Sequence, residues 1–209
     1  MLALAGRIAV IAVVLAPSTA AAQDGAYGRL TGDLTLEAAL GGGAAFEQDV
    51  RGAATLELRA RYLDVAGLFA GLELRADGAS RALFGADLRP LFLARFLLNA
   101  SLHDRYWDVF LDSIGIDLGV AIVPLDELVG AALAIGFGAD VPLVFFGDGY
   151  EGISLRLAGR HVAALATDRF APDGGISDWL VMASIVVRGS VVTGLPGWEP
   201  PRYELSEPD

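Results

Sequence analysis

The chain has 209 residues, of which 54% are hydrophobic and 20% are charged, and its mean hydropathy is +0.51. This apolar content excludes an intrinsically disordered chain, and the net charge of −11 argues against binding to nucleic acid through its phosphates. Because the chain has no cysteine, disulfides, thiolate zinc sites and cysteine nucleophiles are excluded as well. All 15 cationic residues are arginine.

The first 22 residues have the features of a secretory signal peptide. Arg7 supplies a positive start, Ile8–Ala16 forms an apolar run, and Ala20–Ala22 provides small residues for cleavage. The run is too short for a membrane-spanning helix, which needs about 20 apolar residues. We therefore expect an exported protein that is cleaved after Ala22, with one domain over residues 23–193.

Beyond the signal peptide, apolar and polar residues alternate with a period of two. In one segment, Leu56 and Leu58 alternate with Glu57 and Arg59. This period is typical of a strand with one apolar face, whereas a helix repeats its apolar residues every three or four positions. Eight segments are predicted to be strands: Tyr27–Leu40, Val50–Leu63, Ala66–Asp77, Arg81–Leu97, Val109–Val123, Leu128–Asp140, Tyr150–Leu165 and Ser177–Val192.

The segments between the predicted strands contain glycine, proline and acidic residues that are typical of loops. Long connections are expected at Gly41–Asp49, Asn99–Asp108 and Val141–Gly149. Pro90 lies inside the fourth predicted strand and is a candidate break in it. Residues 194–209 are rich in proline and acidic side chains, which predicts a disordered C-terminal tail.

Charges of both signs share the polar face of successive strands. They predict an ion-pair network inside a narrow barrel, because buried charges must be paired. The segments are also longer than the five or six residues of an average strand, as a tilted membrane-spanning strand requires. The residues selected for the network are Glu57, Arg59, Glu73, Arg75, Asp87, Arg89, Arg156 and Arg160. We expect the double charge reversal, Glu57→Arg with Arg59→Glu, to retain more stability than either single change.

Over residues 27–193, this pattern resembles the small bacterial outer-membrane β-barrels with eight strands. The resemblance implies an all-β, antiparallel up-and-down transmembrane barrel of about eight strands with a polar, filled interior. It also implies a monomer in the bacterial outer membrane that contacts outer-membrane lipid and has a structural or surface-interaction role. Two alternatives remain open: a narrow porin-like pore or transport barrel for lipid or small solutes, and a soluble periplasmic calyx that binds a small apolar ligand.

The sequence offers little sign of catalysis or metal binding. His103 lies near Ser101 and Asp104, but neighbours in sequence rarely form a catalytic triad, and the G-x-S-x-G motif is absent. Histidine pairs and calcium loops with metal-binding spacing are also absent. We expect no enzyme activity, no cofactor, no metal site and no nucleic-acid partner.

Overall fold

The computed structural model describes residues 30, 32–46, 49–76, 80–98, 100–123, 130–147, 149–164 and 177–194. The expected signal peptide lies outside the described residues. So does the expected C-terminal tail after Gly194.

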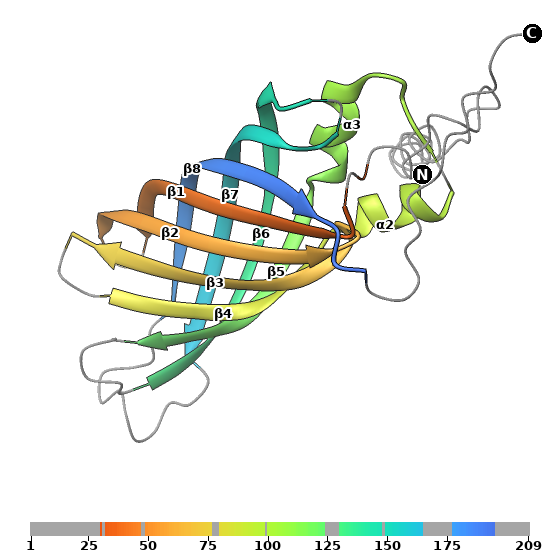
Figure 1. Ribbon diagram of the computed structural model, residues 1–209. Coiled ribbons are helices and arrows are strands. Elements are labelled where there is room, and N and C mark those ends of the chain that lie inside the picture. Colours follow the sequence, from red (N-terminus) through yellow and green to blue (C-terminus); the bar gives the residue numbers. More distant parts are fainter. Residues whose placement is uncertain are drawn as a thin grey trace, which may run out of the picture.

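Eight antiparallel strands form a closed barrel in which each strand pairs with its neighbours in the chain and β1 pairs with β8 (Figure 1). This closed up-and-down topology confirms the predicted all-β fold with eight strands. Two short helices lie between β4 and β5. The elements are β1 (Leu34–Phe46), β2 (Val50–Tyr62), β3 (Ala66–Arg75), β4 (Ser80–Leu88), α2 (Pro90–Leu97), α3 (Arg105–Asp112), β5 (Gly115–Val123), β6 (Gly130–Phe145), β7 (Gly152–Ala164) and β8 (Ser177–Val191).

The predicted fourth strand is wrong beyond Leu88, where the chain turns into α2. Pro90 occupies the first turn of this helix, a position at which its missing N–H costs no hydrogen bond. The start of the predicted fifth strand is also wrong, because residues 109–112 belong to α3. Asp104 caps α3 by accepting hydrogen bonds from the N–H groups of Tyr106 and Trp107.

Two connections predicted as loops are instead the ends of long strands. Gly41–Ala45 continues β1, between β2 and β8. In the second predicted loop, Val141–Gly149, the strand β6 continues as far as Phe145, and its register with β7 shifts between Pro142 and Val144. Such a bulge accommodates proline, which cannot donate a hydrogen bond to the neighbouring strand.

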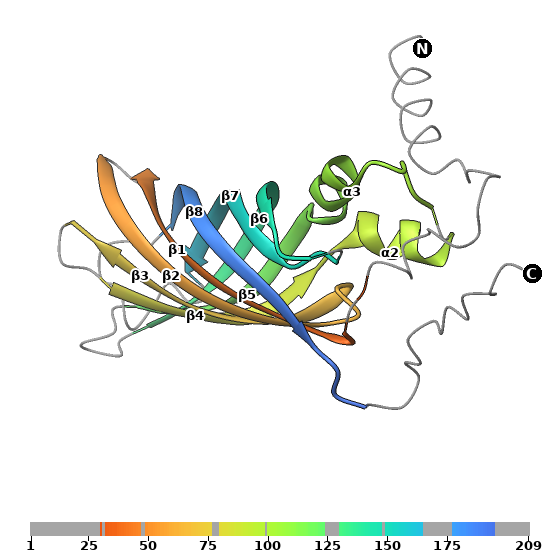
Figure 2. The same cartoon turned by 45° about the horizontal axis from the view of Figure 1, so that its top comes forward.

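Both short helices lie at one end of the barrel, which we call the helix end (Figure 2). The first strand begins and the last strand ends at this same end, where Leu34 of β1 pairs with Val191 of β8. Residues from both helices, from the segment before β1 and from the β6–β7 connection pack together at this end in an apolar cluster of Leu30, Phe92, Val109 and Tyr150. We call the opposite end, where Phe46 at the end of β1 pairs with Val50 at the start of β2, the loop end.

The two faces of the barrel wall differ completely in charge. Outward-facing positions of the described strands carry no Asp, Glu or Arg, whereas inward-facing positions carry many. Leu40, Leu68 and Phe137 point outward and are 67%, 70% and 62% exposed. The strands therefore turn their apolar face away from the barrel and their charged face into it.

Inside the wall, the ring of Phe69 lies against two glycines that face each other across β4 and β5. Gly85 pairs with both Phe69 and Gly119. A Cβ atom on Gly85 would lie 2.3 Å from the carbonyl oxygen of Leu118 and 2.6 Å from Cε1 of Phe69. These distances leave no room for a side chain at residue 85.

We expect Gly85→Ala to lower the free energy of unfolding by about 1–3 kcal/mol, because the added methyl group overpacks the interior. Urea unfolding, followed by the gel shift between folded and unfolded barrel, measures this loss. Gly52→Ala is the matched control, since a Cβ atom at Gly52 has no neighbour within 4 Å. Equal stability of the two variants would contradict the close packing at Gly85.

Candidate functional site

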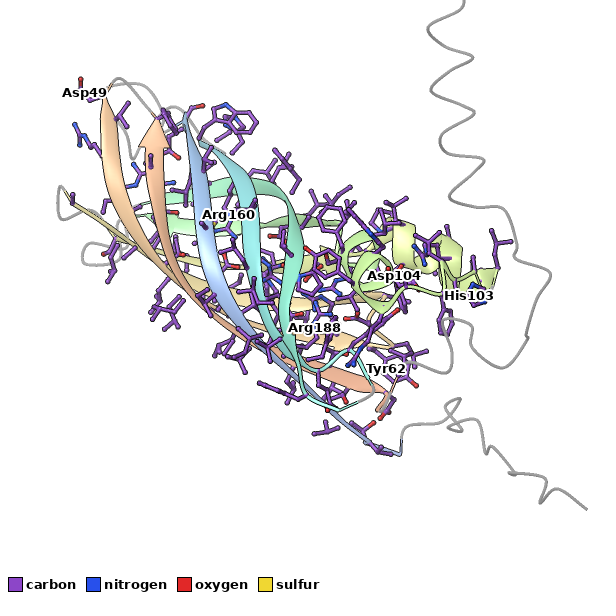
Figure 3. All side chains as sticks on the ribbon, turned by 90° about the horizontal axis from the view of Figure 1, so that it is seen from above. Asp49, Tyr62, His103, Asp104, Arg160 and Arg188 are labelled. Atoms are coloured by element: carbon purple, nitrogen blue, oxygen red, sulfur yellow. The ribbon has the colours of Figure 1, made fainter. Side chains whose placement is uncertain are left out.

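Twelve charged side chains form a continuous set of ion pairs inside the barrel, which we call the lumen network. It joins six arginines to six carboxylates, so its formal charges balance. All twelve residues are buried. Arg160 and Arg188 are labelled inside the barrel in Figure 3, far from the exposed Asp49 at the loop end. The members are Arg59, Arg61, Arg89, Arg156, Arg160, Arg188, Glu37, Glu57, Asp64, Asp87, Asp117 and Asp140.

Glu37 on β1 is the centre of this network, because four guanidinium groups donate hydrogen bonds to its carboxylate. Arg61 binds both oxygens, at 2.6 and 2.7 Å. Arg156, Arg188 and Arg89 donate at 2.6, 2.7 and 3.1 Å, respectively. One carboxylate thereby links β1 to β2, β7, β8 and the start of α2. Bidentate arginine–carboxylate contacts are among the strongest hydrogen bonds in proteins.

Arg59 on β2 connects the carboxylates of three strands. It donates hydrogen bonds to Asp87 on β4 at 2.8 Å, to Asp117 on β5 at 2.6 Å and to Glu57 on its own strand at 2.8 Å. Glu57 in turn accepts a hydrogen bond of 2.5 Å from Arg160 on β7. These contacts extend the network across the full width of the interior.

An apolar layer borders this part of the network. Phe69 packs with Leu83 and Val162 inside the barrel. The guanidinium carbons of Arg59 and Arg160 lie 5.3 and 5.7 Å from the centroid of the Phe69 ring. Both distances fall within the range of cation–π contacts. The layer therefore packs against the charged side chains as well as filling space.

The β2–β3 turn contributes a carboxylate in a strained backbone conformation. Asp64 has a φ of 56°, in the left-handed region that non-glycine residues rarely adopt. Its carboxylate accepts a hydrogen bond of 2.7 Å from Arg89. Burial, together with the neighbouring Arg61, lowers the pKa of Arg89 from its ordinary value, and Asp64 opposes this shift.

A second, smaller cluster lies toward the loop end and has two charges of each sign. Arg75 donates a hydrogen bond of 3.0 Å to Glu73, and Arg81 donates one of 3.0 Å to Asp178. Arg75 also contacts Asp178, which joins β3 to β8 across the interior. All four side chains are buried.

At the helix end, a third cluster fastens the two helices to the barrel. Arg95 on α2 forms ion pairs with Asp108 and Asp112 on α3. Tyr150, in the β6–β7 connection, donates a hydrogen bond of 2.6 Å from its hydroxyl to the carboxylate of Asp112. These buried contacts hold both helices over the end of the barrel.

The sequence-selected residues fall into two of these groups. Glu57, Arg59, Asp87, Arg89, Arg156 and Arg160 belong to the lumen network, whereas Glu73 and Arg75 belong to the loop-end cluster. The selection missed Glu37, Arg61, Asp117, Asp140 and Arg188, although all five occupy the polar positions of the predicted strands. Asp64 lies in a turn, where alternation gives no signal.

A small cavity of about 20 Å³ lies between Arg59, Arg61, Asp117 and Arg156. This volume suits about one water molecule. The Nη1 atom of Arg156 has no hydrogen-bond partner among the described residues.

The residues near His103 do not form a catalytic triad. The Ser101 hydroxyl donates a hydrogen bond to Asp108 at 3.0 Å, and the Asp104 carboxylate caps α3. Among the described residues, no group of three His, Cys, Asp or Glu side chains is placed to hold a metal ion. The helices of the described part are all too short or too polar to cross a membrane.

Comparison of the chain with protein-family models, curated proteins and solved structures finds no match. The function is therefore inferred from the fold and from the placement of charges alone.

We expect Glu37→Gln to lower the free energy of unfolding by about 3–5 kcal/mol, because it leaves an excess of buried positive charge. Urea unfolding measures the loss. Asp49→Asn is the control. The Asp49 side chain is 80% exposed, and its ion pair with Arg51 is long, at 4.0 Å. A change within about 0.5 kcal/mol for both variants would show that Glu37 is not the centre of the network.

The contacts of Glu57 and Arg59 reverse the expectation for the double charge reversal. Glu57→Arg places a second guanidinium beside Arg160, and Arg59→Glu places a third carboxylate beside Asp87 and Asp117. Both changes bring like charges together. We therefore expect the double variant to be no more stable than the less damaged single variant. The same unfolding assay tests this, and recovery of stability in the double variant would show that the two residues pair mainly with each other.

Proposed function

We propose that this protein is an exported bacterial outer-membrane β-barrel with a structural or surface-interaction role and no catalytic activity. One observation carries the proposal: the outward-facing positions of all eight described strands lack Asp, Glu and Arg, while the interior holds balanced charges. A membrane barrel needs this arrangement, because its outer wall contacts lipid and its interior is polar.

The apolar outer wall would be costly in water. Soluble monomers rarely expose a continuous apolar patch larger than a few hundred Å². Here, large apolar side chains are exposed on every strand of the closed barrel. A lipid bilayer would cover this surface, which is why a membrane location accounts for it better than a soluble one.

Aromatic side chains lie near both ends of the wall. Phe46 and Trp179 are exposed at the loop end, and Trp107 and Phe146 are exposed at the helix end. Aromatic rings favour the interface between hydrocarbon and water, and they form bands at both edges of membrane barrels. Their placement supports a wall that spans from one interface to the other.

The filled interior favours a closed barrel over a pore. The lumen network joins opposite strands, and α2 and α3 lie over the helix end. Eight-stranded barrels are in general just wide enough for side chains to fill them. We therefore propose that the protein does not conduct solutes in its resting state.

The soluble calyx receives less support from the same arrangement. A calyx for an apolar ligand needs an apolar lining, whereas this interior is lined by charged residues over much of its length. The apolar residues of the described strands point mainly outward, where they would meet water in the periplasm.

A charge placed on the outer wall tests the membrane proposal. Leu157 is 52% exposed in the middle of β7. In a bilayer, Leu157→Arg should lower stability by about 2–4 kcal/mol, because arginine would face hydrocarbon. In a soluble protein, the same exposed substitution should change stability by less than about 0.5 kcal/mol.

The measurement combines cell fractionation with the gel shift of folded barrel in outer-membrane extracts. Wild type and the control Asp49→Arg, at an exposed position of the loop end, should fractionate with the outer membrane and remain folded. Leu157→Arg should be depleted there. Recovery of the wild-type protein in the soluble periplasm would overturn the proposal.

Planar-bilayer recordings separate a closed barrel from a pore. Purified wild-type protein should insert without steady conductance, because charged side chains fill the lumen. Stable conductance steps that scale with protein concentration would instead establish the alternative of a narrow channel.

A further inference from the structure

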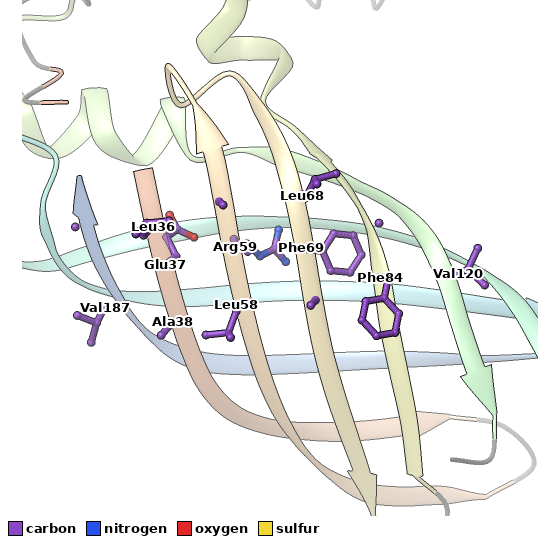
Figure 4. Close-up of a pocket in the computed structure, with 14 residues that line it drawn as sticks. Leu36, Glu37, Ala38, Leu58, Arg59, Leu68, Phe69, Phe84, Val120 and Val187 are labelled. Carbon is purple, nitrogen blue, oxygen red and sulfur yellow. The ribbon is translucent and has the colours of Figure 1, made fainter. Parts of the chain in front are cut away.

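A broad apolar groove lies on the outside of the barrel, from β8 across β1 to β4 and up to β5 (Figure 4). Its volume is about 950 Å³. Glu37 and Arg59 are among its lining residues, but their charged groups are hydrogen-bonded inside the barrel. The surface open to the outside is therefore formed by aliphatic and aromatic side chains.

Alternation of small and large residues between neighbouring strands shapes the groove. In one row across the strands, Ala38 pairs with Leu58, Leu58 pairs with Ala70, and Ala70 pairs with Phe84. Leu58 and Phe84 are 57% and 52% exposed and project from the wall. The alanines between them leave the depressions.

The adjacent row has the opposite order. Leu36 pairs with Ala60, and Ala60 pairs with Leu68. Each alanine is therefore surrounded by larger side chains of its own row and of the next. Leu36 and Leu68 are 44% and 70% exposed, so they form raised edges around the depressions.

The chemistry of the groove restricts its occupant. With no charged group facing outward, it offers nothing to bind a phosphate or a carboxylate. A closed barrel also has no free strand edge that could pair with an extended peptide.

We propose that this groove holds an acyl chain of a membrane lipid, an inference that rests on the proposed membrane location. In a bilayer, the depressions at Ala38, Ala60 and Ala70 cannot stay empty without losing dispersion contacts. A flexible acyl chain follows an irregular surface between raised leucines. The convex, rigid wall of a second barrel would fit such a concave surface poorly.

Photo-crosslinking in vesicles tests the site. Purified full-length protein is reconstituted in palmitoyl-oleoyl phosphatidylethanolamine containing a fraction of the same lipid with a diazirine in the middle of one acyl chain. Peptide mass spectrometry then locates the labelled residues. Labelling should concentrate on the outward residues that line the groove, including Val187 on β8 and Val120 on β5, and should exceed that of the other outward positions.

Filling the groove supplies the matched comparison. The double variant Ala60→Leu/Ala70→Leu should reduce labelling of the groove to the level of the remaining wall. Ala54→Leu/Ala131→Leu adds the same bulk at two outward positions that do not line the groove, and it should label as wild type does.

The outcomes distinguish this site from the membrane location. Even labelling around the wall would overturn the acyl-chain site and leave the barrel in the bilayer. Absence of label from the whole wall would overturn the membrane location itself. A native mass of twice the monomer, with the groove protected from label, would assign the groove to a second copy of the chain.

Discussion

The structure depends on the neutralisation of charge inside a narrow barrel. Glu37 accepts hydrogen bonds from four arginines that come from different parts of the chain. In a medium of low dielectric constant, each of these groups would be strongly destabilising alone, and together they are stable only as a balanced set. The outer wall can be free of charge because the charged side chains of the described strands point inward, where each one has an ion-pair partner.

The use of arginine follows from this constraint. Each guanidinium carries several N–H donors in a fixed plane, so Arg59 can bind three carboxylates at once. A lysine would supply one compact charge at the same position and would lose its proton more readily when buried. Space for these long side chains comes from small residues on the inner face, among them Gly136, whose Cβ would lie 3.2 Å from Asp117.

Alternation in the sequence was sufficient to predict the strands and the face on which charges lie, because both depend on the two-residue period of a strand. The helices were missed because the segment around Pro90 satisfies both periods: Phe92 and Phe96 are four residues apart, and they also continue the spacing of the preceding strand. The partners within the network were not predictable either. Which carboxylate meets Arg61 depends on the tilt and register of the closed barrel, to which all eight strands contribute.

The pairing of β1 with β8 has a consequence for how the molecule forms. The ion pair between Glu37 and Arg188 joins positions 151 residues apart, and the barrel cannot close before β8 is in place. Chains dominated by such distant contacts fold slowly, because the entropy of a long loop must be lost before the contact forms. Until that last strand arrives, Glu37 lacks one of its arginines and β1 has an open edge. Closure of the wall and completion of the charge balance are therefore the same event. A chain that lacks its final strand has both an open strand edge and an incomplete set of buried ion pairs, and an open edge favours aggregation.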